Sequence, residues 1–339
     1  MVSVNPLARL FIQGSKMNLW KSAASSVLCL TPLLVQAQTG PYPNKPIKLV
    51  VGFAPGGAAD YVARAVGDSL GRALGQTIVV DNKAGAGSSI AADAVAKAAP
   101  DGYTLLIASP AAISVNPALN PKLGYTAKDL MPISKVTSSP LVIAANPSAG
   151  ISSVRELIAK AKAAPGALNY ATSGNGSAPH LGAALFSQIA GVQMQHIPFK
   201  GGAPAIQSVV AGDTQLTFGT PPSVLPMVQA GRLKGLAVSS KERSALVPDL
   251  PGMAEAGLPG YAIEFWYGFF VPAGTPPAIV KRLFDATQQA LQQPPVKAAL
   301  AREGTEVSLS ASPESFALFL AEDAKFWVKL VKDADVKSE

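Results

Sequence analysis

Three glycine-rich loops contain the residues of this sequence that could hold a ligand. They are the stretches 55–57 (PGG), 172–177 (TSGNGS) and 200–202 (KGG), and each follows an apolar, strand-like run and precedes a helix-like pattern. The N–H groups at the start of a helix have no partner within the helix, and glycine lets an anion come close to them. One such loop alone could be a tight connection, but three in corresponding positions indicate a binding site for an anion.

The motifs of nucleotide-binding proteins do not explain these loops. The sequence has no G-x-x-x-x-G-K-S/T, and the stretch 85–90 (GAGSSI) lacks the third Gly or Ala of a dinucleotide fingerprint. The stretch 67–71 (GDSLG) satisfies the G-x-S-x-G pattern of serine hydrolases. However, it lies inside a helix-like pattern, where Ser69 cannot form the strand–turn–helix elbow that a nucleophile needs. We therefore interpret that match as a coincidence.

The only two histidines of the chain, His180 and His196, argue against a metal site. No H-x-H, H-E-x-x-H or acidic cluster accompanies them, so the usual spacing of metal ligands is missing. His180 lies in the first turn of the helix after the second loop, either as a surface residue near the cap or as a donor that faces a ligand. His196 is expected to pack within a strand.

Several other polar and aromatic residues near the loops allow two interpretations each. Asp60 could complement the positive end of a helix or meet an ammonium group of an amino-acid ligand. Lys200 could be a solvated charge at the rim or a partner for an acidic ligand. Trp266 and Tyr267 could belong to the core or form an aromatic wall at a cleft.

The elements that must position these loops alternate between strand and helix. Buried strand patterns at 47–53, 77–82 and 103–109 are separated by helical patterns, and a second series of the same kind starts near Pro140. Such alternation is typical of a mostly parallel sheet with helices on both faces. A long apolar segment near residue 265 returns to the first series. The sequence therefore predicts an α/β protein of two lobes with a ligand cleft between them.

The first 37 residues have the pattern of a secretory signal peptide. A basic Lys21 precedes the apolar stretch 23–35 and a small-residue cleavage site at Ala37. Removal of Arg9, Lys16 and Lys21 with this segment would reduce the 28 basic residues to 25, against 21 acidic ones. The single cysteine, Cys29, would also be lost. We expect an exported, mildly basic protein that does not bind nucleic acid, has no disulfide and has no later membrane span.

Most of the chain after the signal segment resembles the Bug family, the extracytoplasmic solute receptors of tripartite tricarboxylate transporters. The resemblance rests on stretches that follow one another in the family's order, at 42–64 (YPNKPIKLVVGFAPGGAADYVAR), 74–106, 169–186 (NYATSGNGSAPHLGAALF), 197–218 (IPFKGGAPAIQSVVAGDTQLTF), 230–244, 248–261 and 270–277. Their number and order make the resemblance far more specific than any single loop.

The resemblance implies the two-domain periplasmic-binding-protein fold, often called a Venus flytrap, in which two α/β domains close on a ligand. Domain 1 would comprise residues 42–144 and 268–339, and domain 2 residues 145–267. The carboxylate of the ligand would be held mainly by main-chain N–H groups and water in the loop that contains Pro55, Gly56, Gly57 and Ala58. The cleft would also be faced by Asp60, Ser109, Ser173, Ser177, His180, Lys200 and Gly201.

The implied function is that of a receptor and not of an enzyme. A periplasmic monomer without a cofactor would bind a small carboxylate, such as an organic acid or an amino acid, and deliver it to integral membrane transporter subunits. A receptor that signals to a membrane sensor kinase and an exported hydrolase that uses Ser69 are the alternatives. The chain departs from many relatives at Gly219, where an Asp is frequent, so its choice of ligand could differ from theirs.

Overall fold

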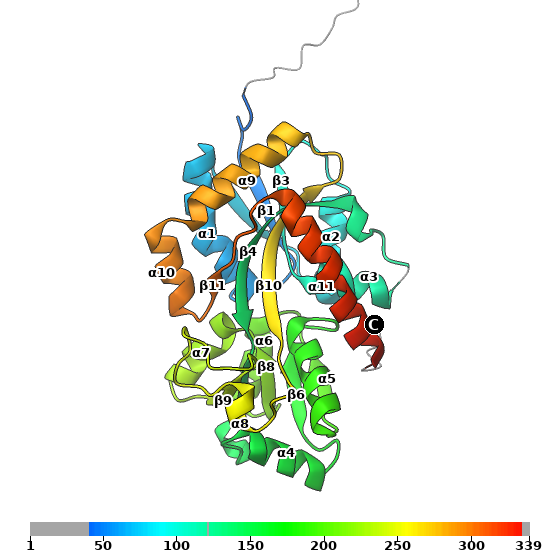
Figure 1. Ribbon diagram of the computed structural model, residues 1–339, viewed down its shortest axis with the longest axis vertical. Coiled ribbons are helices and arrows are strands. Elements are labelled where there is room, and N and C mark those ends of the chain that lie inside the picture. The colour runs from blue at the N-terminus through cyan, green and yellow to red at the C-terminus, as the bar shows by residue number, and fades with distance from the viewer. Residues whose placement is uncertain (1–40, 121, 334–339) are drawn as a thin grey trace, which may run out of the picture. The chain divides into compact units, whose positions relative to one another are not determined.

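The chain forms two β-sheets with helices packed around each of them in a computed structural model that describes residues 41–120 and 122–333. We call residues 41–140 and 264–333 lobe 1 and residues 141–263 lobe 2. Figure 1 shows lobe 1 in the upper part of the view and lobe 2 in the lower part. The predicted signal peptide at 1–37 lies outside the described residues.

The sheet of lobe 1 combines parallel and antiparallel pairing. Its strands are β1 (Ile47–Val51), β2 (Ile78–Asn82), β3 (Thr104–Ala108), β4 (Leu130–Pro140), β10 (Glu264–Pro272) and β11 (Glu306–Val307), in the order β11-β4-β10-β3-β1-β2. β1 pairs in parallel with β2 and β3, so that Leu49 lies opposite Val80 and Leu105. β10 runs antiparallel to β3 and β4. The expected parallel pairing is therefore present, and the returning segments add antiparallel strands.

Lobe 2 has a smaller sheet of the same mixed kind. Its strands are β5 (Val142–Ala145), β6 (Asn169–Thr172), β7 (Gln195–Pro198), β8 (Leu216–Gly219) and β9 (Lys234–Val238), in the order β7-β6-β8-β5-β9. β6 pairs in parallel with β7 and β8, whereas β5 runs antiparallel to β8 and β9. The carboxyl ends of β6, β7 and β8 each lead into a helix. The glycine-rich loops predicted this arrangement after β6 and β7.

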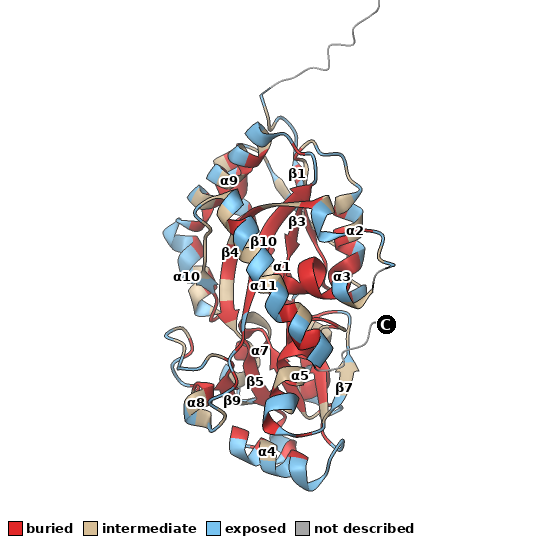
Figure 2. Ribbon diagram, turned by 45° about the vertical axis from the view of Figure 1, so that its right-hand side comes forward, coloured by how far each residue is buried: buried red, intermediate tan, exposed pale blue. Residues whose placement is uncertain are grey.

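The helices cover both faces of each sheet. In lobe 1 they are α1 (Ala58–Leu74), α2 (Ser89–Ala96), α3 (Asn116–Leu119), α9 (Pro277–Leu291), α10 (Pro294–Arg302) and α11 (Pro313–Asp333). In lobe 2 they are α4 (Val154–Ala163), α5 (Ala178–Ala190), α6 (Gly202–Ala211), α7 (Pro221–Gln229) and α8 (Met253–Ala256). Figure 2 shows that the inner strands are mostly buried, whereas the edge strand β7 is partly exposed.

Alternation along the strands distributes side chains between two layers of core in lobe 1. Leu49 of β1 packs in one apolar cluster with Val62 of α1, whereas its neighbour Val50 packs in another with Val95 of α2 and Phe316 of α11. All five side chains are at most 1% exposed. Burying each such side chain contributes roughly 1.5–3 kcal/mol, so the strand is fixed by both layers.

The long α1 begins and ends at glycines that suit these positions. Gly57 is the N-cap in an extended conformation, and Gly75 is the C-cap with φ 74°. Only glycine adopts that left-handed conformation without a steric penalty, and the Gly75 N–H donates to the carbonyl of Arg72 over 3.3 Å. The start of α1 is thereby fixed at the loop that carries the predicted ligand site.

Two long segments connect the lobes and set their boundaries. β4 ends at Pro140 and β5 begins at Val142, and the return path enters β10 at Glu264. The predicted boundaries after residues 144 and 267 instead fall at β5 and inside β10. Since β5 pairs only with strands of lobe 2 and β10 only with strands of lobe 1, sheet membership places the crossings near residues 141 and 263.

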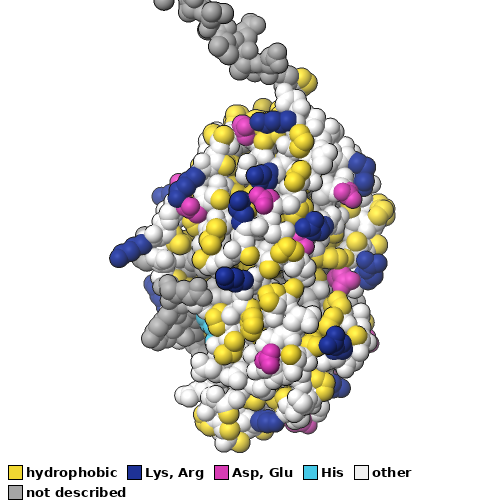
Figure 3. Space-filling view, turned by 180° about the vertical axis from the view of Figure 1, so that it is seen from behind, with side chains coloured by type: hydrophobic (Ala, Val, Ile, Leu, Met, Phe, Trp, Pro, Cys, Tyr) yellow, Lys and Arg dark blue, Asp and Glu magenta, His cyan; other side chains and the backbone are white. Residues whose placement is uncertain are grey.

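The surface of the described residues carries mixed charge. Figure 3 shows one face, on which lysine and arginine side chains are interspersed with acidic ones and do not form a basic patch. Among the helices that the structure describes, none is both long and apolar enough to cross a bilayer.

Candidate functional site

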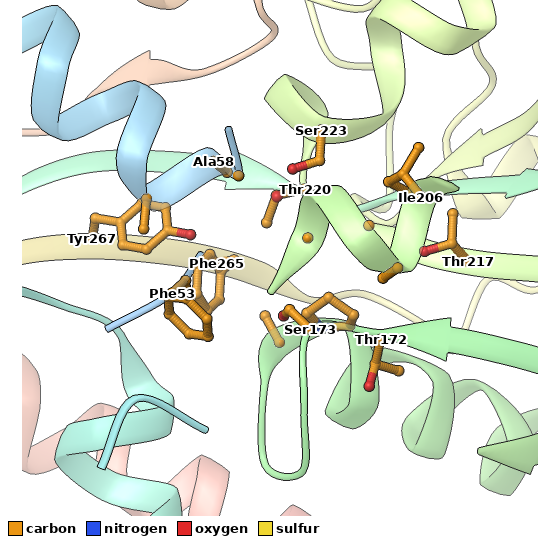
Figure 4. A pocket seen from close by; sticks show the side chains of 17 residues that line it. Phe53, Ala58, Thr172, Ser173, Ile206, Thr217, Thr220, Ser223, Phe265 and Tyr267 are labelled. Atoms are coloured by element: carbon orange, nitrogen blue, oxygen red, sulfur yellow. The ribbon is translucent and has the colours of Figure 1, made fainter. Parts of the chain in front are cut away.

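A pocket lies between the lobes and is lined by both of them (Figure 4). Lobe 1 contributes a hydrophobic wall of Phe53, Gly57, Ala58, Ala59, Phe265 and Tyr267. Lobe 2 contributes small and hydroxyl-bearing residues, which are Thr172, Ser173, Ala178, Pro179, Gly202, Ala205, Ile206, Thr217, Gly219, Thr220 and Ser223. The lining surrounds about 450 Å³ of empty space, part of which is open to solvent.

Three helices direct free N–H groups at this pocket. The lining includes the first residues of α1, α5 and α6, namely Ala58, Ala178 and Gly202. Their N–H groups donate to no other described residue, because the first turn of a helix has no internal acceptors. The helix dipoles add positive potential at the same place. These three helix starts can therefore hold an anion without any cationic side chain.

The fourth helix at the pocket, α7, contributes hydroxyl groups instead. Its first two residues are Pro221 and Pro222, which have no N–H, and Ser223 donates its own N–H to the carbonyl of Thr220. The Ser223 hydroxyl is buried and has no hydrogen-bond partner among the described residues. It is thus available to a ligand.

No charged side chain belongs to the lining of this pocket. The nearest acid of the first loop, Asp60, is buried and accepts hydrogen bonds from the Gly56 N–H and from the Arg64 guanidinium, both at 3.0 Å. Burial opposes ionisation of Asp60, but these hydrogen bonds outweigh it and keep the pKa of the carboxyl below its ordinary value. Asp60 therefore supports the start of α1 and lies outside the lining.

The lobes contact each other beside the pocket, at what we call the pocket interface, formed by residues 53–58 and 199–203. The Ala54 N–H donates to the carbonyl of Lys200 over 3.3 Å. A Cβ placed on Gly201 would lie 3.0 Å from the Ala54 nitrogen, and Gly201 has φ 136°. The close approach of the two backbones thus requires glycine at position 201.

A second contact, which we call the Asn116 interface, joins residues 85–89 and 116 of lobe 1 to residues 174–176 of lobe 2. A Cβ on Gly87 would lie only 2.4 Å from the carbonyl oxygen of Asn175. The Asn116 amide donates to the Gly87 carbonyl and to the Ser89 hydroxyl, both at 2.8 Å. This amide therefore holds the lobe 1 loop in the shape that meets lobe 2.

Of the residues that the sequence pointed to, the structure places three in the lining of the pocket, namely Gly57, Ala58 and Ser173. Pro55 and Gly56 lie at the exposed tip of the first loop. Lys200 is exposed and Gly201 is buried at the pocket interface, and neither lines the pocket.

The remaining candidates are buried behind the pocket wall. Ser177 donates its hydroxyl to the carbonyl of Gly174 over 2.6 Å. Ser109 follows β3 and is 1% exposed, and its hydroxyl has no partner among the described residues. Neither residue lines the pocket in this conformation. Ser109 directly follows β3, and Ser177 is the N-cap of α5.

The two histidines form a stacked pair behind the lobe 2 wall. The rings of His180 and His196 lie 3.8 Å apart at an angle of 12°. Nδ1 of His180 accepts the Gly176 N–H over 3.1 Å, and Nε2 of His196 is 2.6 Å from the Thr172 hydroxyl. Burial lowers the pKa of His180 to about 3 and that of His196 to about 4, so both rings are neutral at pH 7. They support the loop and do not supply charge.

The structure shows which of Trp266 and Tyr267 belongs to the core and which lies at the cleft. Tyr267 lines the pocket, whereas Trp266 points to the opposite face of β10, where it packs against Phe316 and donates to Asp323 over 2.9 Å. Adjacent strand residues point to opposite faces, so only one of the two can reach the cleft.

Sequence reasoning missed several lining residues, among them Phe53, Phe265, Thr220 and Ser223. Thr220 and Ser223 had a detectable signal, because the segment from β8 into α7 is another connection from a strand to a helix. The aromatic residues had none, since only the packing of β10 between the two lobes brings them to the pocket.

Among the described residues, no group of three or more histidine, cysteine or acidic side chains is arranged to hold a metal ion. The chemistry available at the pocket is therefore that of main-chain donors, hydroxyl groups and apolar contacts.

Comparisons with known proteins identify the family. Residues 62–336 match the family described as "Tripartite tricarboxylate transporter family receptor". Protein BugT of Bordetella pertussis is 38% identical over 298 residues, which cover 87% of this chain and 91% of that protein.

Solved structures agree with this match. The structure described as R. palustris Rpa4515 with adipate is similar with a TM-score of 0.83 at 32% identity, over 87% of this chain and 99% of that one. MatC from Rhodopseudomonas palustris with bound malate has a TM-score of 0.81 at 32% identity, over 86% and 100% of the two chains. The periplasmic binding protein BugD has the same fold, with a TM-score of 0.83 at 33% identity, over 88% and 100%. The chain therefore belongs to the Bug family of periplasmic solute-binding receptors of tripartite tricarboxylate transporters.

Proposed function

We propose that this protein captures a small carboxylate between its two lobes and delivers it to the membrane subunits of a tripartite transporter. One observation carries the proposal. The free N–H groups at the starts of α1, α5 and α6 meet at one pocket, which is lined by no acidic side chain that would repel an anion. The relatives solved with adipate and with malate support a carboxylate as the anion.

The magnitudes indicate what the N–H groups can and cannot supply. One partly buried helix start stabilises an anion by up to about 2 kcal/mol, so three of them reach about 6 kcal/mol at most. Micromolar affinity corresponds to about −8 kcal/mol, before the cost of immobilising the ligand is counted. Apolar contacts must therefore provide a substantial part of the affinity. Phe53, Phe265 and Tyr267 are placed to provide it.

Capture would follow from closure of the lobes. Because the pocket walls come from both lobes, a ligand makes its full set of contacts only when they are together. It therefore shifts the open–closed equilibrium toward the closed form. In this proposal the segments near residues 141 and 263 act as the hinge between two domains. The mature protein would work as a monomer in the periplasm, and its closed form would be what the transporter recognises.

Binding can be tested with two variants of Ala58. Ala58→Pro removes one free N–H at the first helical position, which tolerates proline, and the preceding Gly57 is already extended (φ −86°, ψ 173°) as proline requires. The matched control, Ala58→Gly, keeps the N–H. After unfolding and refolding to remove bound solute, both variants and the wild type are screened by thermal shift against carboxylates and their amides.

The proposal expects carboxylates, and not their amides, to raise the melting temperature of the wild type and of Ala58→Gly, since a ligand that binds only the folded state stabilises it. Ala58→Pro should stay folded and lose this shift. An unchanged shift in folded Ala58→Pro would contradict the role of the α1 start. Delivery is tested separately, by asking whether membranes that contain the transporter subunits retain the loaded protein more than the unloaded protein.

A further inference from the structure

The lobe 1 side of the pocket offers an ionised group the start of α1 and no charged side chain. None of the lining side chains is charged, and Asp60 is already paired with Arg64. Lys200 is exposed outside the lining, and His180 is buried outside it. A charge buried without a partner or hydrogen bonds is strongly unfavourable. A ligand with charges at both ends would therefore have to divide the helix starts between them.

The same side of the pocket is an aromatic wall. Phe265 and Tyr267 lie two residues apart on one face of β10, and their rings meet edge to face with centroids 5.0 Å apart. Phe53 completes the wall from the end of the segment that follows β1 (Figure 4). Such a surface favours an apolar body, and above all a flat one that can pack against the rings.

Regular alternation along β10 places Tyr267 on the same face as Phe265 and opposite to Trp266. The register between β10 and β4 shifts after Tyr267, where the pairing moves from Thr137 to Lys135, and the extra residue lies on β4. The Tyr267 hydroxyl donates to no other described residue, and Figure 4 shows it directed into the pocket. It is a neutral hydrogen-bonding group that remains for the ligand.

From these features, and resting on the proposed function, we infer that the natural ligand is a monocarboxylate. Its apolar, preferably aromatic, body packs on Phe53, Phe265 and Tyr267, and any polar group at its other end is uncharged. Its carboxylate faces the helix starts, and a hydroxyl or carbonyl elsewhere on the ligand meets Tyr267. This chain would then differ in ligand from the relatives solved with the dicarboxylates adipate and malate.

Calorimetric titration with matched pairs tests the inference. Hexanoate and adipate share a six-carbon chain and differ in the second carboxylate, and benzoate and terephthalate differ in the same way on an aromatic ring. The inference expects each monocarboxylate to bind at least tenfold more tightly than its partner. It also expects benzoate to bind more tightly than hexanoate.

The outcomes separate this inference from the proposed function. A dicarboxylate that binds as tightly as its monocarboxylate partner, or more tightly, overturns the inference and leaves carboxylate capture standing. Failure of all four acids to bind folded, stripped protein overturns both.

The role of Tyr267 is tested with 4-hydroxybenzoate. Tyr267→Phe should weaken 4-hydroxybenzoate severalfold and leave benzoate nearly unchanged, because only the former reaches the hydroxyl. The control is Tyr61→Phe, whose hydroxyl bonds to the carbonyl of Ala299 away from the pocket and which should change neither affinity. Equal effects of Tyr267→Phe on both acids would contradict the assigned orientation of the ligand.

Discussion

The pocket interface and the Asn116 interface differ in their polar groups. At the pocket interface, the N–H groups of Ala58 and Gly202 have no partner among the described residues. At the Asn116 interface, the Asn116 amide donates to Gly87 and Ser89 within lobe 1, although the buried Ser88 hydroxyl has no partner among the described residues. The pocket interface therefore keeps main-chain N–H groups free for a ligand, whereas the Asn116 interface determines how the two lobes meet.

The two interfaces also differ in backbone strain. Ala86 and Ser88 have φ of 45° and 78°, and they are the only described residues other than glycine with positive φ. Such conformations cost roughly 1–3 kcal/mol each and persist where the surroundings impose them. Here Asn116 and the facing loop of lobe 2 provide these surroundings. The strain therefore lies in the contact that positions the lobes and not in the one that binds.

The largest effect is expected from breaking the Asn116 interface. Gly87→Ala would place a Cβ 2.4 Å from the Asn175 carbonyl oxygen, so the lobes could no longer approach fully. We expect affinity for every bound carboxylate to fall at least tenfold in calorimetry, with the order of preference unchanged.

The matched control for that change is Gly191→Ala. Gly191 has a similar φ of 62° but no atom within 4 Å of an added Cβ. Both substitutions pay about 1–2 kcal/mol for the left-handed conformation, so only Gly87→Ala should also lose affinity. Equal losses in the two variants would show that the second contact does not control closure.

A smaller effect is expected from removing the amide that holds the loop. Asn116→Ala leaves the buried Gly87 carbonyl without its donor and should lower the free energy of unfolding by about 1–3 kcal/mol. Urea denaturation measures this loss. Asn120→Ala serves as the control, since its side chain accepts only an exposed N–H from Lys122 and should cost under about 0.5 kcal/mol. A loss of unfolding free energy no larger than that of the control would contradict the role of Asn116 in holding the lobe 1 loop.

The histidine pair should make the lobe 2 wall sensitive to acid. The pKa values of His180 and His196 are lowered in the folded state to about 3 and 4, from an ordinary value of 6.5. The unfolded chain therefore binds protons first as the pH falls. The stability contributed by the neutral pair is complete above pH 6.5 and declines as the pH falls from 6.5 to about 3.

His196→Gln keeps a hydrogen-bonding group for Thr172 and removes one titrating ring. The urea midpoint of this variant should fall less steeply between pH 6.5 and 4 than that of the wild type. Parallel curves would mean that other groups cause the acid sensitivity.

The smallest effect on binding is expected at Asp60. Because its buried carboxylate is engaged by Gly56 and Arg64 and lies outside the lining, Asp60→Asn should cost about 1–3 kcal/mol of stability. It should change amino-acid and simple carboxylate affinities by the same small factor. A selective loss for amino acids in calorimetry would instead place Asp60 in contact with a ligand ammonium group.

The sequence predicted best those helices and strands whose signals lie within a few neighbouring residues. Ser312 as N-cap and Pro313 after it predict a helix at this point of the sequence. The structure has α11 there, and the Ser312 hydroxyl accepts the Ser315 N–H over 3.1 Å. β4 was missed, because LMPISKVTSSP has no clear alternation. It is a strand because it pairs along its length with β10, which lies more than 120 residues away in the sequence.

The residues of the candidate site also differ in whether a local sequence pattern could predict them. Gly57 and Ser173 could be predicted because a glycine-rich loop between a strand pattern and a helix pattern is visible in the sequence. Phe53 and Phe265 could not, because an apolar residue next to a strand is usually core. Its exposure to a cleft depends on how the two lobes meet, which no local pattern encodes.

The most direct test of the central claim is a calorimetric titration of the stripped protein with hexanoate and with hexanamide at the same pH. These ligands share the apolar chain and differ in the anionic group. The account predicts that hexanoate binds, and that hexanamide binds at least tenfold more weakly, because the free helix starts favour the anion. Equal binding of the two would contradict a carboxylate site built from main-chain N–H groups.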